Sequence, residues 1–426
     1  MKRITLVACL ALAALAARAE EPPLTLGEAL RRAVERSTLV AAQDAAIDAS
    51  RHMAVSARQL PDPVLKVGVQ NVPVSGADRF TAGGDFMTMR QVGVTQEITR
   101  EGKRELRAER YRLEARKSQA ERRDVIATLQ RNAALAWIDG YYATAVSRLV
   151  DEQAAAARLE AEGAEAAYRA GRGAEADVFA ARGALAALED RAAEAHRREA
   201  TARIGLARWI GPRADAPLAG PPPIEAVGDR HHESHIESHP MIEALARQED
   251  IASTEARLAQ ANATPDWSVE LMYSVRGSAF SDMVSVGLSV PLPWDRANRQ
   301  DQEVAAKLAL ASQVRALRED AVRAHAAEIQ AARTEWESDR ERLARYEKEL
   351  VPLAQERAAA TLAGYRGGRA SLAETLAARR NEMEVRTQAV QLEREAARAW
   401  AQLDFLVPDE SSLPPGLDLG GGEGSR

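Results

Sequence analysis

One stretch of the chain has the composition of a single very long helix, and it limits the possible folds more than any other feature. From about Glu101 to Tyr168 the sequence is rich in Ala, Glu, Arg and Leu and contains no proline, which strongly favours helix. At 1.5 Å per residue this helix would be a rod about 100 Å long. A second stretch of this kind runs from about Arg299 to Leu362, where Pro352 predicts a kink. The sequence therefore predicts a mainly helical protein built on two long rods.

Two shorter helices are expected in the first half, from Leu26 to Leu60 and from Ala174 to Trp209, each about 50 Å long. Their summed length equals one long rod, which suggests a wall with one continuous helix beside two stacked shorter ones. Aromatic residues make up only 4% of the chain, and abundant alanine would allow close, shallow packing. The same composition also fits a soluble coiled-coil spacer, so composition alone leaves tunnel and spacer open.

The chain is duplicated at a spacing of roughly 200 residues, which indicates two copies of one domain. Each half has the order helix, strand, strand, long helix, turn, helix, over residues 20–210 and 241–407. Residues 211–240 are rich in proline and glycine and predict an irregular connector, and residues 408–426 predict a disordered tail. The repeated motifs are Leu60-Pro61-Asp62-Pro63 with Thr264-Pro265-Asp266-Trp267, and Tyr168-Arg169-Ala170-Gly171-Arg172-Gly173 with Tyr365-Arg366-Gly367-Gly368-Arg369-Ala370.

Four segments alternate apolar and polar residues with the period of two that marks half-buried strands, in hairpins at about 64–98 and 267–292. Polar residues on the opposite face, expected to face water, are Lys66, Gln70, Glu97, Glu270 and Arg276. The apolar face carries Leu65, Val67 and Val69; Val92 and Val94; Trp267, Val269, Leu271, Tyr273 and Val275; and Val284, Val286, Leu288, Val290 and Leu292.

The first residues predict a secretory signal over positions 1–19. Lys2 and Arg3 precede an apolar run, and Ala17-Arg18-Ala19 resembles a cleavage site. An uncleaved anchor is disfavoured, because about 12 apolar residues are too few for a crossing that needs about 20. The one cysteine, Cys9, lies in this segment. Its surroundings resemble a lipoprotein box with too short an apolar stretch before it, and its lipidation stays open.

Removal of this segment, with Lys2, Arg3 and Arg18, would change the formal charge from −6 to −9 and leave no thiol. This excludes disulfide scaffolds, cysteine nucleophiles and cysteine-based zinc sites, and it argues against a nucleic-acid partner. No later apolar stretch is long enough for a spanning helix, so any membrane crossing must use strands. Four strands cannot close a barrel, but three copies would supply 12. A soluble pair of hairpins would show the same alternation.

The order of elements and the motifs resemble the outer-membrane efflux protein family, the TolC family, over nearly the whole mature chain. Two junctions resemble its heavy-metal branch, the CzcC and CusC type. These are Thr95-Gln96-Glu97-Ile98 followed by Gly102-Lys103-Arg104, and Pro291-Leu292-Pro293-Trp294 with Asn298-Arg299.

The resemblance implies a homotrimer with a 12-stranded β-barrel in the outer membrane, continuous with an α-helical tunnel that places most of the chain in the periplasm. It implies a passive duct that meets a periplasmic adaptor and an inner-membrane pump of the RND type. The cargo would be heavy-metal cations, with organic solutes or drugs as the alternative. The implied adaptor-docking tips contain Gly171, Arg172, Gly173, Gly367, Gly368 and Arg369.

The resemblance also places Asp177 and Glu374 at the constricted tunnel entrance, where threefold symmetry would make rings of carboxylates that favour cations. Each could equally be a solvated acid at a helix N-terminus. Some relatives in the family carry a further acid one turn later, where this chain has Ala377.

A histidine cluster in the connector has the composition of a metal site: His231, His232, His235 and His239. An incidental, solvated cluster explains these residues as well. The chain lacks a phosphate-binding loop, an HExxH helix and a GxSxG turn. We therefore expect no enzyme activity and no cofactor. A soluble periplasmic scaffold and a secreted enzyme are the competing classes.

Overall fold

The computed structural model describes residues 22–225 and 233–419, and the statements below concern those residues. They form two compact units. The first combines the described residues within 1–40, 123–239 and 324–426, and the second combines residues 41–122 and 240–323. The predicted signal segment with Cys9, and the last glycine-rich residues of the tail, lie outside the described ranges.

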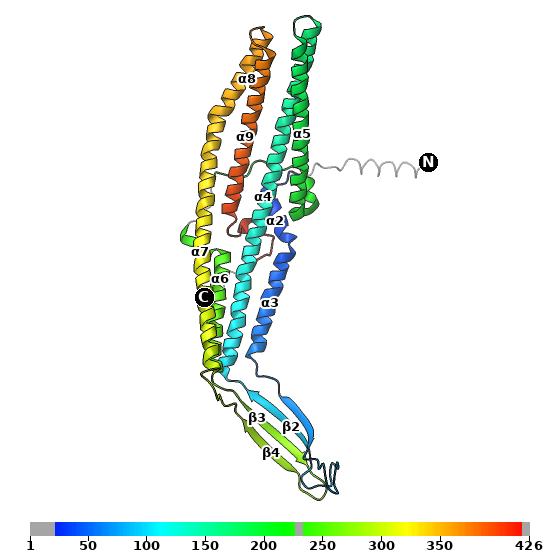
Figure 1. Ribbon diagram of the computed structural model, residues 1–426, viewed down its shortest axis with the longest axis vertical. Coiled ribbons are helices and arrows are strands. Elements are labelled where there is room, and N and C mark those ends of the chain that lie inside the picture. The colour runs from blue at the N-terminus through cyan, green and yellow to red at the C-terminus, as the bar shows by residue number, and fades with distance from the viewer. Residues whose placement is uncertain (1–21, 226–232, 420–426) are drawn as a thin grey trace, which may run out of the picture. The chain divides into compact units, whose positions relative to one another are not determined.

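The first unit is helical and contains two helix hairpins, one from each repeat (Figure 1). Each hairpin reverses at one of the repeated Tyr-Arg motifs. The helices are α2 (Leu26–Glu35), α4 (Glu101–Arg169, shared with the second unit), α5 (Glu175–Ile210), α8 (Val351–Arg366) and α9 (Leu372–Asp404).

The helix predicted from Leu26 to Leu60 is two helices, α2 and α3 (Thr38–Arg58). At the break, the Ser37 hydroxyl accepts a hydrogen bond from the Leu39 amide at 3.2 Å. Serine often competes in this way with the helical pattern of backbone bonds. The single-helix prediction is wrong because apolar spacing continues across a residue that can start a new helix.

The predicted second rod is interrupted next to its proline. α7 (Gln300–Arg345) passes into a π-helical turn, Tyr346–Leu350, and then into α8. The Val351 amide reaches back to the Tyr346 carbonyl. Pro352 follows immediately and has no amide to donate. The wider turn accommodates it, and Figure 1 shows the helix bending between α7 and α8.

Alanine dominates the core of the first unit. Near the tips, Ala161, Ala164 and Ala181 pack with Leu372. A larger cluster contains Val34, Val40, Ile126 and Leu129. Small side chains bring helix backbones close together, as the composition indicates.

The predicted disorder after Pro408 is wrong for the described part of the tail. Leu413, Leu417 and Leu419 pack against the cluster of Val34 and Ile126. The Gln130 side chain also donates to the Asp409 carbonyl at 2.9 Å and accepts from the Asp409 amide at 2.8 Å. Leucines spaced among glycine and proline still bury apolar area, and this burial fixes the segment.

The second unit contains one antiparallel sheet with the order β1-β2-β3-β4 (Figure 1). The two predicted hairpins therefore join, with β2 pairing with β3. The strands are β1 (Val64–Gln70), β2 (Met89–Ile98), β3 (Trp267–Val275) and β4 (Met283–Ser289). The same unit contains nearly all of α3, the N-terminal part of α4 up to Arg122, α6 (Pro240–Asn262) and the first half of α7 up to Arg323.

The register puts apolar residues in rows across one face of the sheet. Leu65 lies opposite Val94, which lies opposite Leu271, which lies opposite Val286. These side chains are exposed, at 66%, 44%, 55% and 75%. An apolar sheet face of this extent normally contacts something else. Among the described residues, no helix has the length and apolar character to cross a membrane.

Candidate functional site

The two hairpin tips have the same backbone geometry. Gly171 and Gly368 both have φ of +68°, which only glycine adopts without strain. The Arg172 amide donates to the Ala167 carbonyl at 2.9 Å, and the Arg369 amide donates to the Gly364 carbonyl at 2.8 Å. The reversal therefore depends on one glycine in each motif.

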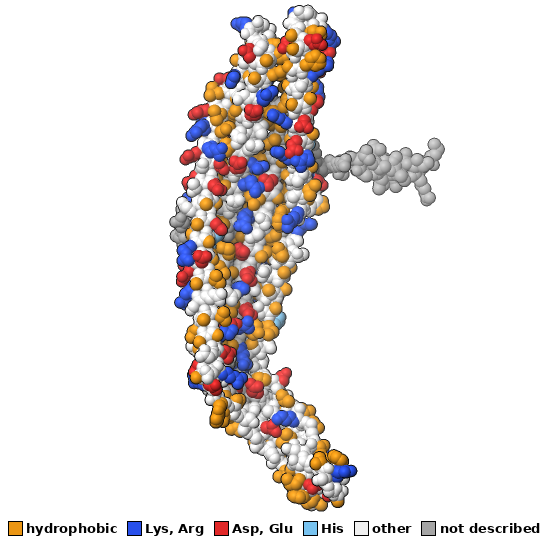
Figure 2. All heavy atoms as spheres, viewed as in Figure 1, with side chains coloured by type: hydrophobic (Ala, Val, Ile, Leu, Met, Phe, Trp, Pro, Cys, Tyr) orange, Lys and Arg blue, Asp and Glu red, His pale blue; other side chains and the backbone are white. Residues whose placement is uncertain are grey.

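The other two tip glycines have different roles. Gly367 has φ of −87°, so it needs no left-handed backbone. A Cβ on Gly173 would lie 3.3 Å from the Tyr168 nitrogen. Arg172 and Arg369 are exposed, and their side chains have no ion pair within the described residues. Figure 2 shows basic side chains at both hairpin ends. Within the described residues, each tip thus carries an exposed guanidinium without an ion pair.

Asp177 and Glu374 occupy the third position of α5 and α9, just past each tip. Glu374 accepts from the Ser371 amide at 2.8 Å and from its hydroxyl at 3.0 Å. The Ser371 hydroxyl accepts a hydrogen bond from the Glu374 amide at 3.2 Å, which completes a capping box. The hydrogen bond from the Ser371 backbone lowers the pKa of Glu374. Asp177 accepts from the Ala174 amide at 3.4 Å. Both acids cap their helices.

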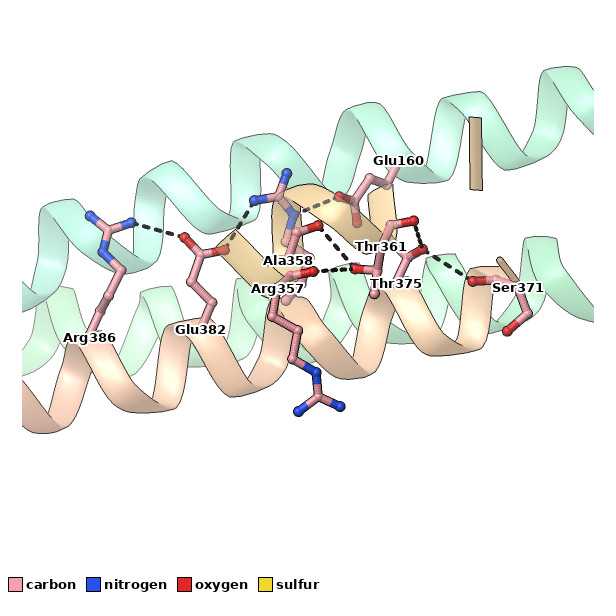
Figure 3. Close-up of polar contacts among 9 residues, drawn as sticks. Glu160, Arg357, Ala358, Thr361, Ser371, Thr375, Glu382 and Arg386 are labelled. Carbon is pink, nitrogen blue, oxygen red and sulfur yellow. Dashed lines mark hydrogen bonds and ion pairs between the residues drawn. The ribbon is translucent and has the colours of Figure 1, made fainter. Parts of the chain in front are cut away.

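Below the tips, a charged contact joins the two hairpins (Figure 3). The Arg379 guanidinium of α9 donates to Glu160 of α4 at 3.2 Å and to Glu382 of its own helix at 3.2 Å. Glu382 is buried, and Arg386 lies 3.8 Å from its other oxygen. A buried carboxylate is stable as an anion only when cations and donors surround it.

The contact is the first of a series. Arg386 lies 3.6 Å from Glu152, and Arg398 lies 2.5 Å from Asp139. Arginines on α9 thus pair in order with acids on α4, as two antiparallel helices require. The pattern links the first hairpin to the second over much of their length.

A cavity of about 320 Å³ lies beside this series, between α4, α5 and α9. Alanine at the lining positions leaves the space open. Its lining includes Ala156, Ala157, Ala184, Ala187, Leu376 and Met383, and its charged residues are Glu160, Arg191, Arg379, Arg380 and Glu384. The sequence did not predict this cavity, because it depends on residues from three helices.

Lys66, Gln70, Glu97 and Glu270 share one side of the sheet by register, and Arg276 directly follows the end of β3. The structure brings two of these five residues together. Lys66 lies 2.5 Å from Glu270, which also accepts from Thr95 at 3.2 Å. Glu97 accepts from Thr99 at 3.4 Å, and Arg276 donates to the Ser281 carbonyl at 2.8 Å. Gln70 is exposed at the end of β1.

The junction between β2 and α4 contains a buried ion pair. The Lys103 ammonium lies 2.8 Å from Asp266 and donates to the Thr264 carbonyl at 2.6 Å. Burial raises the pKa of Asp266, but the hydrogen bonds from Lys103 and the Arg100 amide outweigh it, so the net shift is downward. Lys103 therefore joins the start of the first long helix to the Pro-Asp motif of the second repeat.

The histidine cluster is only partly described. His231 and His232 lie outside the described ranges, and His235 lies in a short helical turn, Glu233–Ser238. His239 is buried, so a solvated cluster is the wrong description of this member. Its Nδ1 lies 2.8 Å from Nε2 of the buried His325 in α7. No group of three metal-ligating side chains occurs within the described residues.

Comparison with known proteins identifies the architecture. The sequence profile of the family described as "Outer membrane efflux protein" matches residues 233–407. The solved structure of the outer-membrane channel OprN has a TM-score of 0.75, covers 90% of each chain and is 17% identical. The chain has the outer-membrane channel fold. No protein of curated function matches it by sequence.

Two further solved structures share the outer-membrane channel fold. CusC, described as forming a transmembrane channel, has a TM-score of 0.77 at 14% identity and covers 92% of this chain and 94% of its own. The outer membrane protein VceC from Vibrio cholerae has a TM-score of 0.72 at 17% identity and covers 89% and 95%. The prediction of a mainly helical chain with a small antiparallel sheet is confirmed.

Proposed function

We propose that this chain is the outer-membrane duct of a tripartite efflux system, a homotrimer that passively conducts substrate out of the periplasm. Three copies would close a 12-stranded barrel in the outer membrane, and most of each chain would form a helical tunnel in the periplasm.

The sheet carries this proposal. Its apolar face is exposed, and its opposite face holds the Lys66–Glu270 ion pair. β1 and β4 are open edges with unpaired backbone groups. Lipid accepts the apolar face but tolerates neither the open edges nor the charged face. A closed ring of copies would pair the edges and enclose the charged face. A soluble scaffold would leave the apolar face and both edges in water.

The tips supply the proposed contact with a periplasmic adaptor, which would link the duct to an inner-membrane pump. Gly171 and Gly368 fix the turns, and Arg172 and Arg369 offer exposed donors. Asp177 and Glu374 would repeat around the entrance, and Glu374 stays ionised at neutral pH because its pKa is lowered.

Heavy-metal cations are the cargo that we propose, on the strength of the junction motifs at Thr95–Ile98 and Pro291–Trp294. Organic solutes are the second candidate, because the fold alone does not determine the cargo, and OprN, VceC and CusC all match this chain to a similar degree. Lys66, Gln70, Glu97, Glu270 and Arg276 would line the water-filled side of the barrel.

Conductance and accumulation test the two parts separately. The purified chain in a planar bilayer should give channels of uniform conductance, and a chain that leaves the bilayer silent would contradict the duct. Cells that lack the chain should accumulate zinc, copper or cobalt above cells that retain it. If such cells accumulate organic dyes but not metals, organic solutes are the cargo.

A further inference from the structure

The buried Lys103–Asp266 pair lies just beyond the ends of the two central strands, β2 and β3, where one repeat meets the other. Ile98 at the end of β2 is opposite Trp267 at the start of β3. Next to this row, Lys103 of the first repeat contacts Asp266 of the second, and the side chains are only 5% and 15% exposed. The Arg100 amide also donates to Asp266 at 3.1 Å. This contact fastens two neighbouring strand ends.

Because the chain is duplicated, a second acid and a second base occupy positions that correspond to those of Asp266 and Lys103. Asp62 stands in the first Pro-Asp motif, just before β1, as Asp266 stands just before β3. Arg299 stands next to the first residue of α7, as Lys103 stands in the first turn of α4. Within one copy, however, the strand that follows Asp62 and the strand that precedes Arg299 are the opposite edges of the sheet.

Both side chains are exposed. Over the part of the chain that the structure describes, neither makes an ion pair or a side-chain hydrogen bond. In the described chain, an unpaired carboxylate therefore precedes edge strand β1 by two residues, and an unpaired guanidinium follows edge strand β4 by ten residues, at the start of α7.

We propose that Arg299 of one copy pairs with Asp62 of the next copy, and that this contact repeats the Lys103–Asp266 pair between copies. The inference rests on the proposed trimer. Because four strands alternate in direction, β4 of one copy can pair with β1 of the next in the antiparallel sense, as β2 pairs with β3. Three such contacts close the ring, and every junction then has one ion pair.

Proline explains why a side-chain contact is needed at this end of the edge. Pro61 and Pro63 precede β1, and Pro291 and Pro293 follow β4. Proline has no amide hydrogen, so the backbone ladder between copies weakens here. An arginine forms two parallel hydrogen bonds with a carboxylate, which suits a contact that must set both distance and orientation.

Cysteine crosslinking tests the contact directly. The only native cysteine is Cys9, in the predicted signal segment. Asp62→Cys with Arg299→Cys, treated in membranes with a short bis-maleimide, should give covalent dimers and trimers. A bis-maleimide can bridge two cysteines that replace long paired side chains, whereas a disulfide needs Cα atoms within about 7 Å of each other. Arg299→Cys with Asp78→Cys, in the β1–β2 loop, is the matched control and should stay monomeric.

The outcomes separate this contact from the proposed function. A wild-type trimer whose Asp62/Arg299 cysteine pair crosslinks no better than the control overturns the contact and leaves the duct standing. A wild-type chain that forms no trimer overturns both.

Charge exchange gives a second readout. Asp62→Arg and Arg299→Asp should each lower the fraction of trimer several-fold at a fixed detergent concentration, and the double exchange should restore it. A double variant no better than either single variant would contradict the ion pair.

Discussion

At the residue scale, the Lys103–Asp266 pair has the clearest energetic consequence. Its side chains are almost fully buried, and removing one member leaves the other charge unpaired and shielded from water. Lys103→Met should destabilise the fold by about 3 kcal/mol, measured as a lower midpoint of unfolding. Lys307→Met breaks a pair with Glu255 that is 35% and 27% exposed, and this control should cost less than about 1 kcal/mol. Equal losses of stability in the two variants would contradict the view that burial makes the Lys103–Asp266 pair costly to break.

Gly171, at the first tip, can be compared with Gly163, which lies within the helix that leads to this tip. A Cβ on Gly171 would meet no atom within 4 Å, so the cost of Gly171→Ala comes only from φ of +68°. We expect about 1 kcal/mol of local destabilisation, seen as faster hydrogen exchange at the tip. Gly163 lies within α4 with equal space. Gly163→Ala should slow exchange, because alanine favours helix by about 1 kcal/mol. The reverse order would contradict the assigned turn.

The capping carboxylate of α9 makes the second tip sensitive to acid. The bond from the Ser371 amide lowers the pKa of Glu374 below 4.5. A lowered folded-state pKa means that the stabilisation is complete above about 4.5 and is lost as the pH falls through the lowered value. Protection of the Ser371 amide, corrected for intrinsic exchange, should therefore decline below pH 4.5 in the wild type. In Glu374→Gln this decline should be absent, and an unchanged decline would exclude the cap as its cause.

At the element scale, local pattern predicted most of the structure. The alternation placed Leu65, Val94, Leu271 and Val286 on one sheet face, and the repeated glycines located both tips. Contacts between residues far apart in the sequence could not be predicted from local pattern. His325 lies 86 residues from its partner His239, on a helix where nothing in the local sequence distinguishes it. The ordered tail likewise depends on a leucine cluster from distant helices.

The π-helical turn gives a prediction about helix register. One extra residue at Tyr346–Leu350 keeps Leu343 before it and Ala354 and Ala358 after it buried. Deleting the exposed Glu347, together with Pro352→Ala, should convert the turn into plain α-helix without shifting those faces. The variant should fold, and circular dichroism should show an unchanged unfolding midpoint. Deleting Ala331 from α7 should rotate the buried face and lower the midpoint. Equal effects would contradict this role.

At the scale of the whole molecule, the duplicated chain leaves one sheet incomplete. Two repeats give each chain four strands and two helix hairpins, and the two open edges leave a sheet that one copy cannot close. The fold is shared with outer-membrane channels over about nine-tenths of the chain. Cargo could not be predicted to the same depth, because it depends on a few pore-lining side chains and on the pump.

The mass of the species extracted from the outer membrane is the most direct test of whether this chain forms a trimeric duct. The expressed chain should fractionate with the outer membrane, and native mass spectrometry of the detergent-extracted protein should give three times the mass of one mature chain. A monomer recovered from the soluble periplasmic fraction would contradict the duct and favour a periplasmic scaffold.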